Sequence, residues 1–205
     1  MEHAAPFAML MEFIEASLHC FLYSRSIYPS SFFAQSTSFD TPVWRCRHSV
    51  LCGYLQTLLA SIGGLMKSNS MSAFTIVQCT KEAKEPLERL SLLIKSFGSP
   101  TAPLVEKEFL SVKTKLQTLI LKVLDTGYKD KESPLATTFY VVVKLKSEDA
   151  NREINMESLL SPVAPWHTVY DERGENSSKS AWSAFLGPSE NAENFCIDLV
   201  LESSQ

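Results

Sequence analysis

The chain has 205 residues, of which 45% are apolar and 20% charged, and its formal net charge is −4. This length suits one domain with a buried core, and the composition is typical of a globular protein rather than a disordered or membrane-embedded one. A weakly acidic chain has no overall field that would hold it on nucleic acid or on an anionic membrane. We therefore expect one globular domain that reaches nucleic acid only through a partner protein.

The amino-terminal stretch is apolar but lacks the features of a secretory signal. Glu2 stands where a basic region is expected, and Glu12 and Glu15 interrupt the apolar residues at helical spacing. The five cysteines are odd in number and scattered along the chain. Such cysteines favour reduced thiols, so we expect an intracellular protein.

Three segments carry apolar residues at the three- and four-residue steps of a helix. They span residues 10–23, 50–62 and 109–123. The first helix is expected to end at Tyr28, because Pro29 disfavours helical geometry in the residue before it. The second is expected to stop near Gly63-Gly64.

Four segments have the alternation or the branched and aromatic content of β-strands. They span residues 72–79, 87–94, 137–146 and 195–202, and the charged turn KEAKEP joins the first two. Residues 147–193 follow no regular pattern but contain Trp166 and Trp182. Loops of this length are uncommon inside compact domains, and two tryptophans argue against full disorder. We therefore predict a long functional arm between the last two strands.

Motifs for catalysis or for phosphate binding are missing from the sequence. Cys46, His48 and Cys52 come nearest to a metal cluster, but a fourth ligand at suitable spacing is lacking. His167 would be the general base of an enzyme, but no nucleophile is fixed near it. We therefore expect no catalytic residues, no metal and no cofactor.

Two consecutive stretches, LYSRSIYPSSFF (22–33) and TPVWRCRHSVLCGYLQTLL (41–59), resemble the HORMA domain. The matching residues are Leu22, Tyr23, Arg25, Ile27, Tyr28, Pro29, Phe32, Val43, His48, Tyr54, Leu55 and Gln56. PWHTVYDE (165–172) is also similar to a Pro-Trp motif of the family. The resemblance covers roughly residues 8–202. Within the family, it is greatest to the small accessory subunits of DNA polymerase zeta.

The resemblance implies a single α+β HORMA domain over residues 1–205, with three main helices packed on an antiparallel sheet. The core would span about 8–146, and a safety-belt arm with a closing strand about 147–202. The belt would wrap over a partner segment that pairs with the strand 137–146. Tyr54 and Trp166 occupy the family's peptide-contact positions and are the predicted peptide-binding residues. The alternative for each is a place in the core.

The implied partner is a proline-containing segment of the catalytic subunit of polymerase zeta, which would place the protein in the nucleus. The alternative within the family is a spindle-checkpoint adaptor that binds a kinetochore or anaphase-regulator peptide, because checkpoint members share the Tyr-Pro ending of the first helix. Relatives can dimerise through the third helix, and the vertebrate subunit binds a Y-family scaffold polymerase through its last strand. Gln117 and Ser26 depart from the dimer residues, and Asp198 and Val200 depart from the scaffold-binding residues, so neither contact is transferred.

Overall fold

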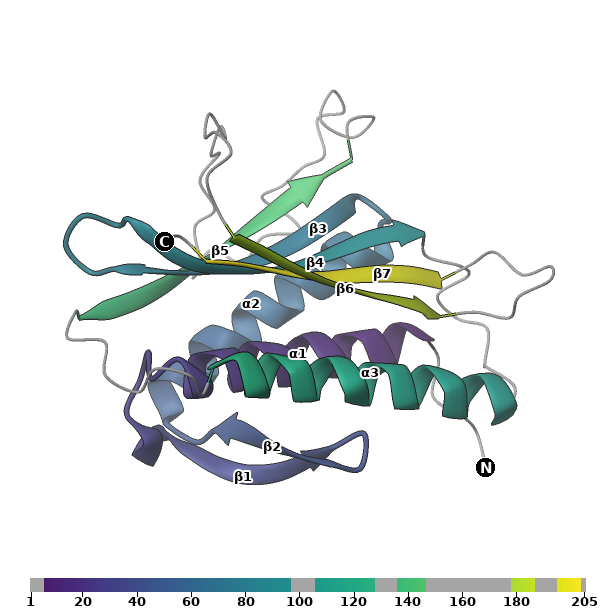
Figure 1. Ribbon diagram of the computed structural model, residues 1–205, viewed down its shortest axis with the longest axis horizontal. Helices are drawn as coiled ribbons and strands as arrows, with labels where there is room; N and C mark the ends of the chain where they lie inside the picture. The colour runs from purple at the N-terminus through teal and green to yellow at the C-terminus, as the bar shows by residue number, and fades with distance from the viewer. Residues whose placement is uncertain (1–5, 97–105, 128–135, 147–177, 187–194, 204–205) are drawn as a thin grey trace.

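The computed structural model describes residues 6–96, 106–127, 136–146, 178–186 and 195–203. Its elements are α1 (Pro6–Ser24), the short 3-10 helix η1 (Ser30–Phe32), β1 (Phe33–Ser38), β2 (Thr41–Cys46), α2 (Ser49–Lys67), β3 (Met71–Thr80), β4 (Pro86–Ser96), α3 (Glu106–Gly127), β5 (Thr137–Leu145), β6 (Ser178–Leu186) and β7 (Phe195–Ser203). Figure 1 shows a five-stranded sheet over a layer of helices, with the β1–β2 hairpin beneath α1 and α3. This is the α+β architecture predicted from the sequence, with the three main helices against an antiparallel sheet.

Helix α1 lies at the centre of the molecule. Between Met9 and Leu22 nearly every side chain is buried, and the only exceptions are Met11, Glu12 and Glu15, which are half-buried. The helix packs against α3, α2 and both strands of the hairpin. A helix that is apolar on almost all sides needs such cover on almost all sides, so α1 organises the core.

The end of α1 comes earlier than predicted, at Ser24 rather than Tyr28. Ser26 adopts the left-handed region with φ of 52°. The N–H of the next residue, Ile27, donates to the Leu22 carbonyl oxygen at 3.1 Å. This six-to-one bond and the left-handed residue form a Schellman motif, which ends the helix before Pro29 has any effect.

The predicted end of the second helix is wrong, because α2 continues through Gly63 and Gly64 to Lys67. A glycine inside a helix costs only about 1 kcal/mol relative to alanine, and this part of α2 is mostly buried. The helix is ended by Asn69, which has φ of 56° and donates its N–H to the Met66 carbonyl oxygen at 3.0 Å. Asparagine is one of the few residues that adopt this conformation readily.

Helix α2 also has the length and composition of a membrane-crossing helix. It has 19 residues and a mean hydropathy of 1.4, and 39% of its apolar window is buried inside the fold. Core helices of folded domains share these properties, so α2 alone is weak evidence for a membrane span.

The sheet has the strand order β5-β3-β4-β7-β6, and all its pairs are antiparallel. Ile76 on β3 pairs with Leu90 on β4, which pairs with Leu201 on β7. All three are buried, and they mark the face that covers the helices. The four strands predicted from the sequence are confirmed as β3, β4, β5 and β7.

Strand β6 corrects the prediction of an irregular arm over residues 147–193. Residues 178–186 form a regular strand that pairs with β7 at one edge of the sheet. Residues 147–177 and 187–193 lie outside the described residues.

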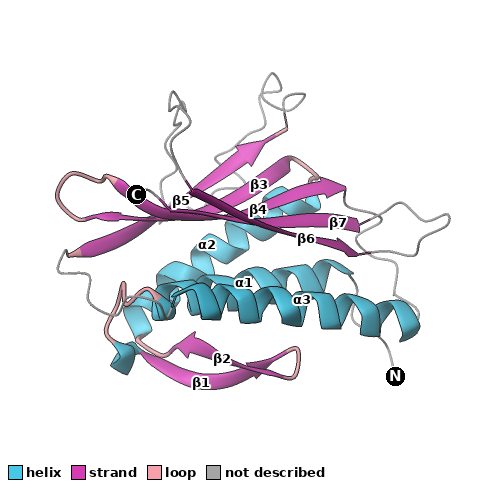
Figure 2. Cartoon of the chain, in the orientation of Figure 1, coloured by secondary structure: helices cyan, strands magenta, loops and turns pink. Residues whose placement is uncertain are grey.

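The β1–β2 hairpin is a second element that the sequence does not predict (Figure 2). Its turn places Phe39 and Asp40 at φ of 50° and 57°, a conformation usually filled by glycine or asparagine. Tertiary contacts hold it: Phe39 is buried, Asp40 forms an ion pair with Lys113 on α3, and the Ser38 hydroxyl donates to Glu12 Oε1 at 2.6 Å. The hairpin is thereby fixed to α1 and α3.

Candidate functional site

An aromatic groove opens where α2 begins, next to strand β5. Its volume is about 380 Å³. Its walls are formed by the segment after α1, the first turns of α2, and β5. The residues that line it are Tyr28, Phe32, His48, Val50, Leu51, Tyr54 and Phe139. Val50 and Tyr54 are among the most exposed large apolar residues of the described structure, at 76% and 40%. The groove therefore offers apolar surface that the described residues leave exposed.

The rings of the groove hold one another in fixed orientations. Phe32 stacks on His48 with centroids 4.1 Å apart and an interplanar angle of 9°. Tyr28 and Tyr54 both meet Phe139 edge-on, at 6.2 and 6.0 Å. Such edge-to-face and stacked pairs are favourable arrangements for aromatic rings. The walls are thus preorganised, and a flat apolar ligand group can bind without first ordering them.

The groove lies beside an open edge of the sheet. Strand β5, which carries Phe139, pairs with β3 on one side, and no described residue pairs with its other side. The outer edge of a strand presents backbone donors and acceptors that a further strand can use. A peptide that paired with β5 would run past the aromatic side chains of the groove.

Two hydroxyls and one imidazole supply the polar groups of the groove. Burial, with smaller contributions from Tyr54 and Cys46, raises the pKa of Tyr28, and burial raises the pKa of Tyr54. Both tyrosines are therefore neutral hydrogen-bonding groups near pH 7. The buried Nδ1 of His48 has no hydrogen-bond partner in the described part of the chain.

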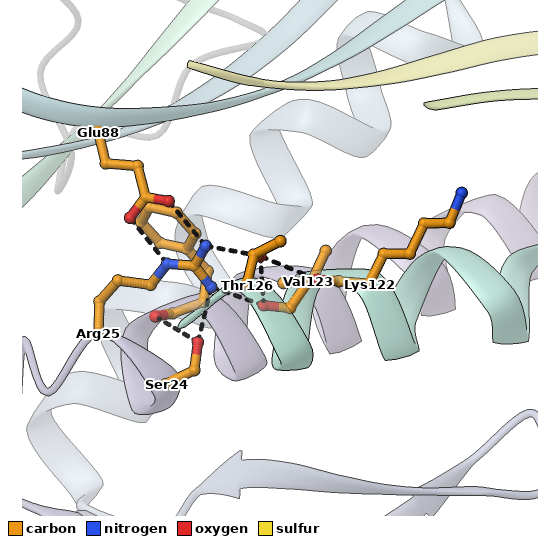
Figure 3. A network of polar contacts seen from close by, with 7 residues as sticks. Ser24, Arg25, Glu88, Lys122, Val123 and Thr126 are labelled. Atoms are coloured by element: carbon orange, nitrogen blue, oxygen red, sulfur yellow. Dashed lines mark hydrogen bonds and ion pairs between the residues drawn. The ribbon is translucent and has the colours of Figure 1, made fainter. Parts of the chain in front are cut away.

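Arg25 anchors the end of α1, directly before the segment that carries Tyr28. Its Nε and Nη2 donate to the two carboxylate oxygens of Glu88 on β4, at 2.9 and 2.8 Å (Figure 3). Its Nη1 donates to the Ser24 hydroxyl at 2.8 Å and to the Val123 carbonyl oxygen at 2.6 Å. Its Nη2 also donates to the Thr126 hydroxyl at 3.0 Å.

All five N–H groups of Arg25 thus have acceptors, and its side chain is only 4% exposed. We call Arg25 and these four partners the Arg25 clasp. The clasp joins the end of α1, strand β4 and the last turn of α3, whose free carbonyl groups favour a cation. It explains why a basic residue stands at the end of an apolar helix, three residues before the groove begins.

His19 fixes the end of β2, two residues before the groove residue His48. Its Nδ1 accepts a hydrogen bond from the Cys46 N–H at 2.7 Å, which ties α1 to the end of β2. Burial, and then the charge of Arg45, lower the pKa of His19 from 6.5 to about 4. The ring is therefore neutral near pH 7, as an acceptor at Nδ1 requires.

The structure brings one of the two predicted peptide-binding residues into the groove. Tyr54 forms part of its wall, and its role in binding stays a prediction. Trp166 and His167 lie outside the described residues. Tyr28, Phe32 and Phe139 are groove residues that sequence reasoning did not assign to the site. The first two belong to the HORMA-like stretch, whereas Phe139 is one of several aromatic and branched residues of a strand and carries no separate signal.

The Cys46, His48 and Cys52 group does not form a metal site. In the ranges that the structure describes, no three histidine, cysteine or acidic side chains gather closely enough to hold a metal ion. The four cysteines whose side chains the structure describes, Cys20, Cys46, Cys52 and Cys79, are free thiols.

Comparison with known proteins gives relatives over most of the chain, although no family model matches it. The mitotic spindle assembly checkpoint protein MAD2B of Danio rerio is 30% identical over 166 residues, which cover 80% of this chain and 76% of the relative. MAD2B of Homo sapiens is 30% identical over 152 residues, or 74% and 69% of the two chains. The DNA polymerase zeta processivity subunit of Schizosaccharomyces pombe is 32% identical over 74 residues, or 36% and 35%.

Solved structures agree on the fold. A chain of the mitotic checkpoint complex superimposes with a TM-score of 0.76 at 16% identity, covering 97% of this chain and 98% of that chain. HTP-2 of C. elegans bound to HTP-3 closure motif 1 gives a TM-score of 0.64 at 13% identity, over 95% and 84% of the two chains. With the sequence relatives, these similarities show that the chain belongs to the HORMA-domain family, in the group of the MAD2B proteins.

Proposed function

We propose that this protein is a non-catalytic accessory subunit of the translesion polymerase DNA polymerase zeta. It would hold a proline-containing segment of the catalytic subunit and so support extension past damaged DNA in the nucleus. The observation that carries the proposal is the aromatic groove beside the open edge of β5. The name of the S. pombe relative, a polymerase zeta processivity subunit, supports the choice of partner.

The geometry suggests how a peptide would bind. Its backbone would extend the sheet at β5, where main-chain hydrogen bonds fix the register of the ligand. A proline ring would pack against Tyr54 and Phe139, which already meet edge-on. Proline rings are rigid and flat enough to cover an aromatic face at little cost in conformational entropy. The edge would supply affinity for any extended segment, and the groove would supply the preference for proline.

The position of β6 supports a belt. Residues 147–177 connect β5 at one edge of the sheet to β6 at the opposite edge. A segment that leaves the sheet after β5 and rejoins it four strands away has the connectivity that a belt over a bound peptide requires. Trp166, within this segment, stays a predicted peptide contact.

Binding of a proline-containing segment of the polymerase zeta catalytic subunit, measured by calorimetry, tests the proposal. Tyr54→Ala should weaken binding by about 1–3 kcal/mol, as expected when an aromatic anchor is truncated. Leu121→Ala is the matched control, because Leu121 is an exposed apolar residue on α3 that does not line the groove. Wild-type affinity in a folded Tyr54→Ala variant would contradict the proposal.

Deletion of the arm is a poor test of the belt. A chain that ended at Lys146 would lose β7, which pairs with β4 and places Leu199 and Leu201 in the core. Loss of binding would then report loss of folding. Trp166→Ala, with circular dichroism as a check on folding, tests the belt instead, and we expect a loss of about 1–3 kcal/mol in binding free energy.

The second candidate function is a spindle-checkpoint adaptor, which the names of the MAD2B relatives favour. Cells that lack the protein discriminate the two functions. Sensitivity to ultraviolet light with fewer induced mutations supports the polymerase role. Sensitivity to spindle poisons with normal tolerance of DNA damage would select the checkpoint role.

A further inference from the structure

Two cysteines meet at the junction between β2 and α2, next in the chain to residues that line the aromatic groove. Cys46 is the last residue of β2, and Cys52 lies in the first turns of α2. The Cys52 thiol donates to the Cys46 carbonyl oxygen at 3.1 Å, and the Cys46 thiol lies 3.8 Å from the His48 carbonyl oxygen. Both thiols therefore belong to one tight turn.

The Cys52 side chain also influences the Cys46 thiol. Burial, followed by the hydrogen bond with the Cys52 side chain, raises the pKa of Cys46 to about 11. Both residues are half-buried, whereas Cys20 and Cys79 are fully buried. Of the cysteines whose side chains the structure describes, Cys46 and Cys52 are thus the pair that is both mutually close and open to a small oxidant.

We propose that Cys46 and Cys52 form a reversible disulfide on exposure to hydrogen peroxide, and that this bond is a redox-sensitive staple across residues that line the groove. The Cys52 thiol loses its proton, and its thiolate attacks hydrogen peroxide. The S–O bond forms, the O–O bond breaks, and the leaving hydroxide takes up a proton to give one water. The Cys46 sulfur then displaces the oxygen of the Cys52 sulfenic acid. The S–S bond forms, the S–O bond breaks, and the Cys46 proton leaves with the oxygen in a second water.

The staple has a structural consequence for the groove. The ring it closes contains His48, Val50 and Leu51, all of which line the groove. A disulfide brings the two sulfurs to about 2.05 Å and removes both thiol hydrogens. The bonds to the Cys46 and His48 carbonyl oxygens are then lost. Because His48 stacks on Phe32, we expect oxidation to disturb the groove wall.

Peptide mapping of the full chain tests the disulfide directly. Trypsin cleaves after Arg45 and Arg47, so it releases Cys46 and Cys52 in separate peptides, Cys46-Arg47 and residues 48–67. After treatment with hydrogen peroxide we expect these peptides to be crosslinked, with a loss of two hydrogens and of two free thiols, and to separate on reduction. Uncrosslinked peptides under conditions that oxidise other exposed thiols would overturn the proposal.

Serine variants assign the steps. In Cys46→Ser, the Cys52 sulfenic acid should persist and be trapped by dimedone, whereas Cys52→Ser should give no trapped product at Cys46. Trapping at Cys46 instead would overturn the assigned order of attack.

The effect on the groove rests on the proposed peptide-binding function and is measured separately. We expect the oxidised protein to bind the polymerase segment about three- to tenfold more weakly than the reduced protein, with no such change in the Cys46→Ser variant. Equal affinities would show that the disulfide leaves the groove unchanged and would overturn its role as a staple there. If the reduced protein does not bind the segment, the proposed function fails, while the peptide map still decides whether the disulfide forms.

Discussion

Arg25 of the clasp and Tyr28 of the aromatic groove are only three residues apart, yet the two regions differ in how their polar and apolar groups are used. In the clasp every N–H of Arg25 has a partner inside the protein. In the groove Tyr54 and Val50 remain exposed, and one edge of β5 is paired with no residue that the structure describes. Groups that are satisfied within the fold contribute stability, whereas groups left unsatisfied are available to a ligand. The clasp is thus a region that holds the fold, and the groove is a region that can bind a partner.

The largest loss of stability is expected for Arg25→Ala. Removing the guanidinium leaves Glu88 largely buried without its cation, so we expect a loss of about 3–5 kcal/mol in the free energy of unfolding, measured by chemical denaturation. Arg25→Lys should recover only part of that loss, because an ammonium group cannot make the paired contacts with Glu88. A loss below about 1 kcal/mol would show that the clasp does not hold the fold.

The pH dependence of stability tests the neighbouring contact of His19. The pKa of His19 is lower in the folded protein, about 4, than its ordinary value of 6.5. The unfolded chain therefore binds the proton more tightly, so stability falls as pH drops from about 6.5 to 4. We expect a loss of about 3 kcal/mol from this group, since each tenfold change in proton affinity corresponds to about 1.4 kcal/mol. His19→Gln should remove this part of the profile, and an unchanged profile in that variant would contradict the assignment.

Truncation on the groove side should have little effect on stability. We expect Tyr54→Ala to lower the free energy of unfolding by about 1 kcal/mol or less, because the side chain is 40% exposed. Thermal and chemical denaturation of this variant beside Arg25→Ala provide the contrast directly. If Tyr54→Ala unfolds the protein as readily as Arg25→Ala, the groove is part of the structural core.

The smallest expected effect is at the link between the two regions. Ser26 holds a positive φ of 52° at the end of α1. Ser26→Gly should raise the free energy of unfolding by about 0.5 kcal/mol, because glycine adopts this conformation without a steric penalty. Ser26→Ala is the matched control and should not be stabilising, and a stabilised alanine variant would show that conformational strain is not the cause.

Elements with a strong hydrophobic periodicity or a distinctive motif can be predicted from the sequence. The three helices and strands β3, β4, β5 and β7 follow from such patterns. The β1–β2 hairpin does not, because Phe39 and Asp40 occupy a turn that glycine usually fills and Pro42 lies within β2. The groove is harder still to predict from the sequence. Tyr28, His48 and Phe139 are far apart in the chain, and only the packing of β5 beside α2 brings them together.

The reach of the Arg25 clasp along the chain has a consequence for folding kinetics. Its bonds join residues 63, 98 and 101 positions apart, and contacts across such long loops have a high entropic cost before they form. We therefore expect the clasp to close after α1, β4 and α3 have docked. Interactions that are absent from the transition state control the rate of unfolding rather than the rate of folding. We expect the clasp to slow unfolding, so that its loss shortens the lifetime of the folded protein far more than it delays folding.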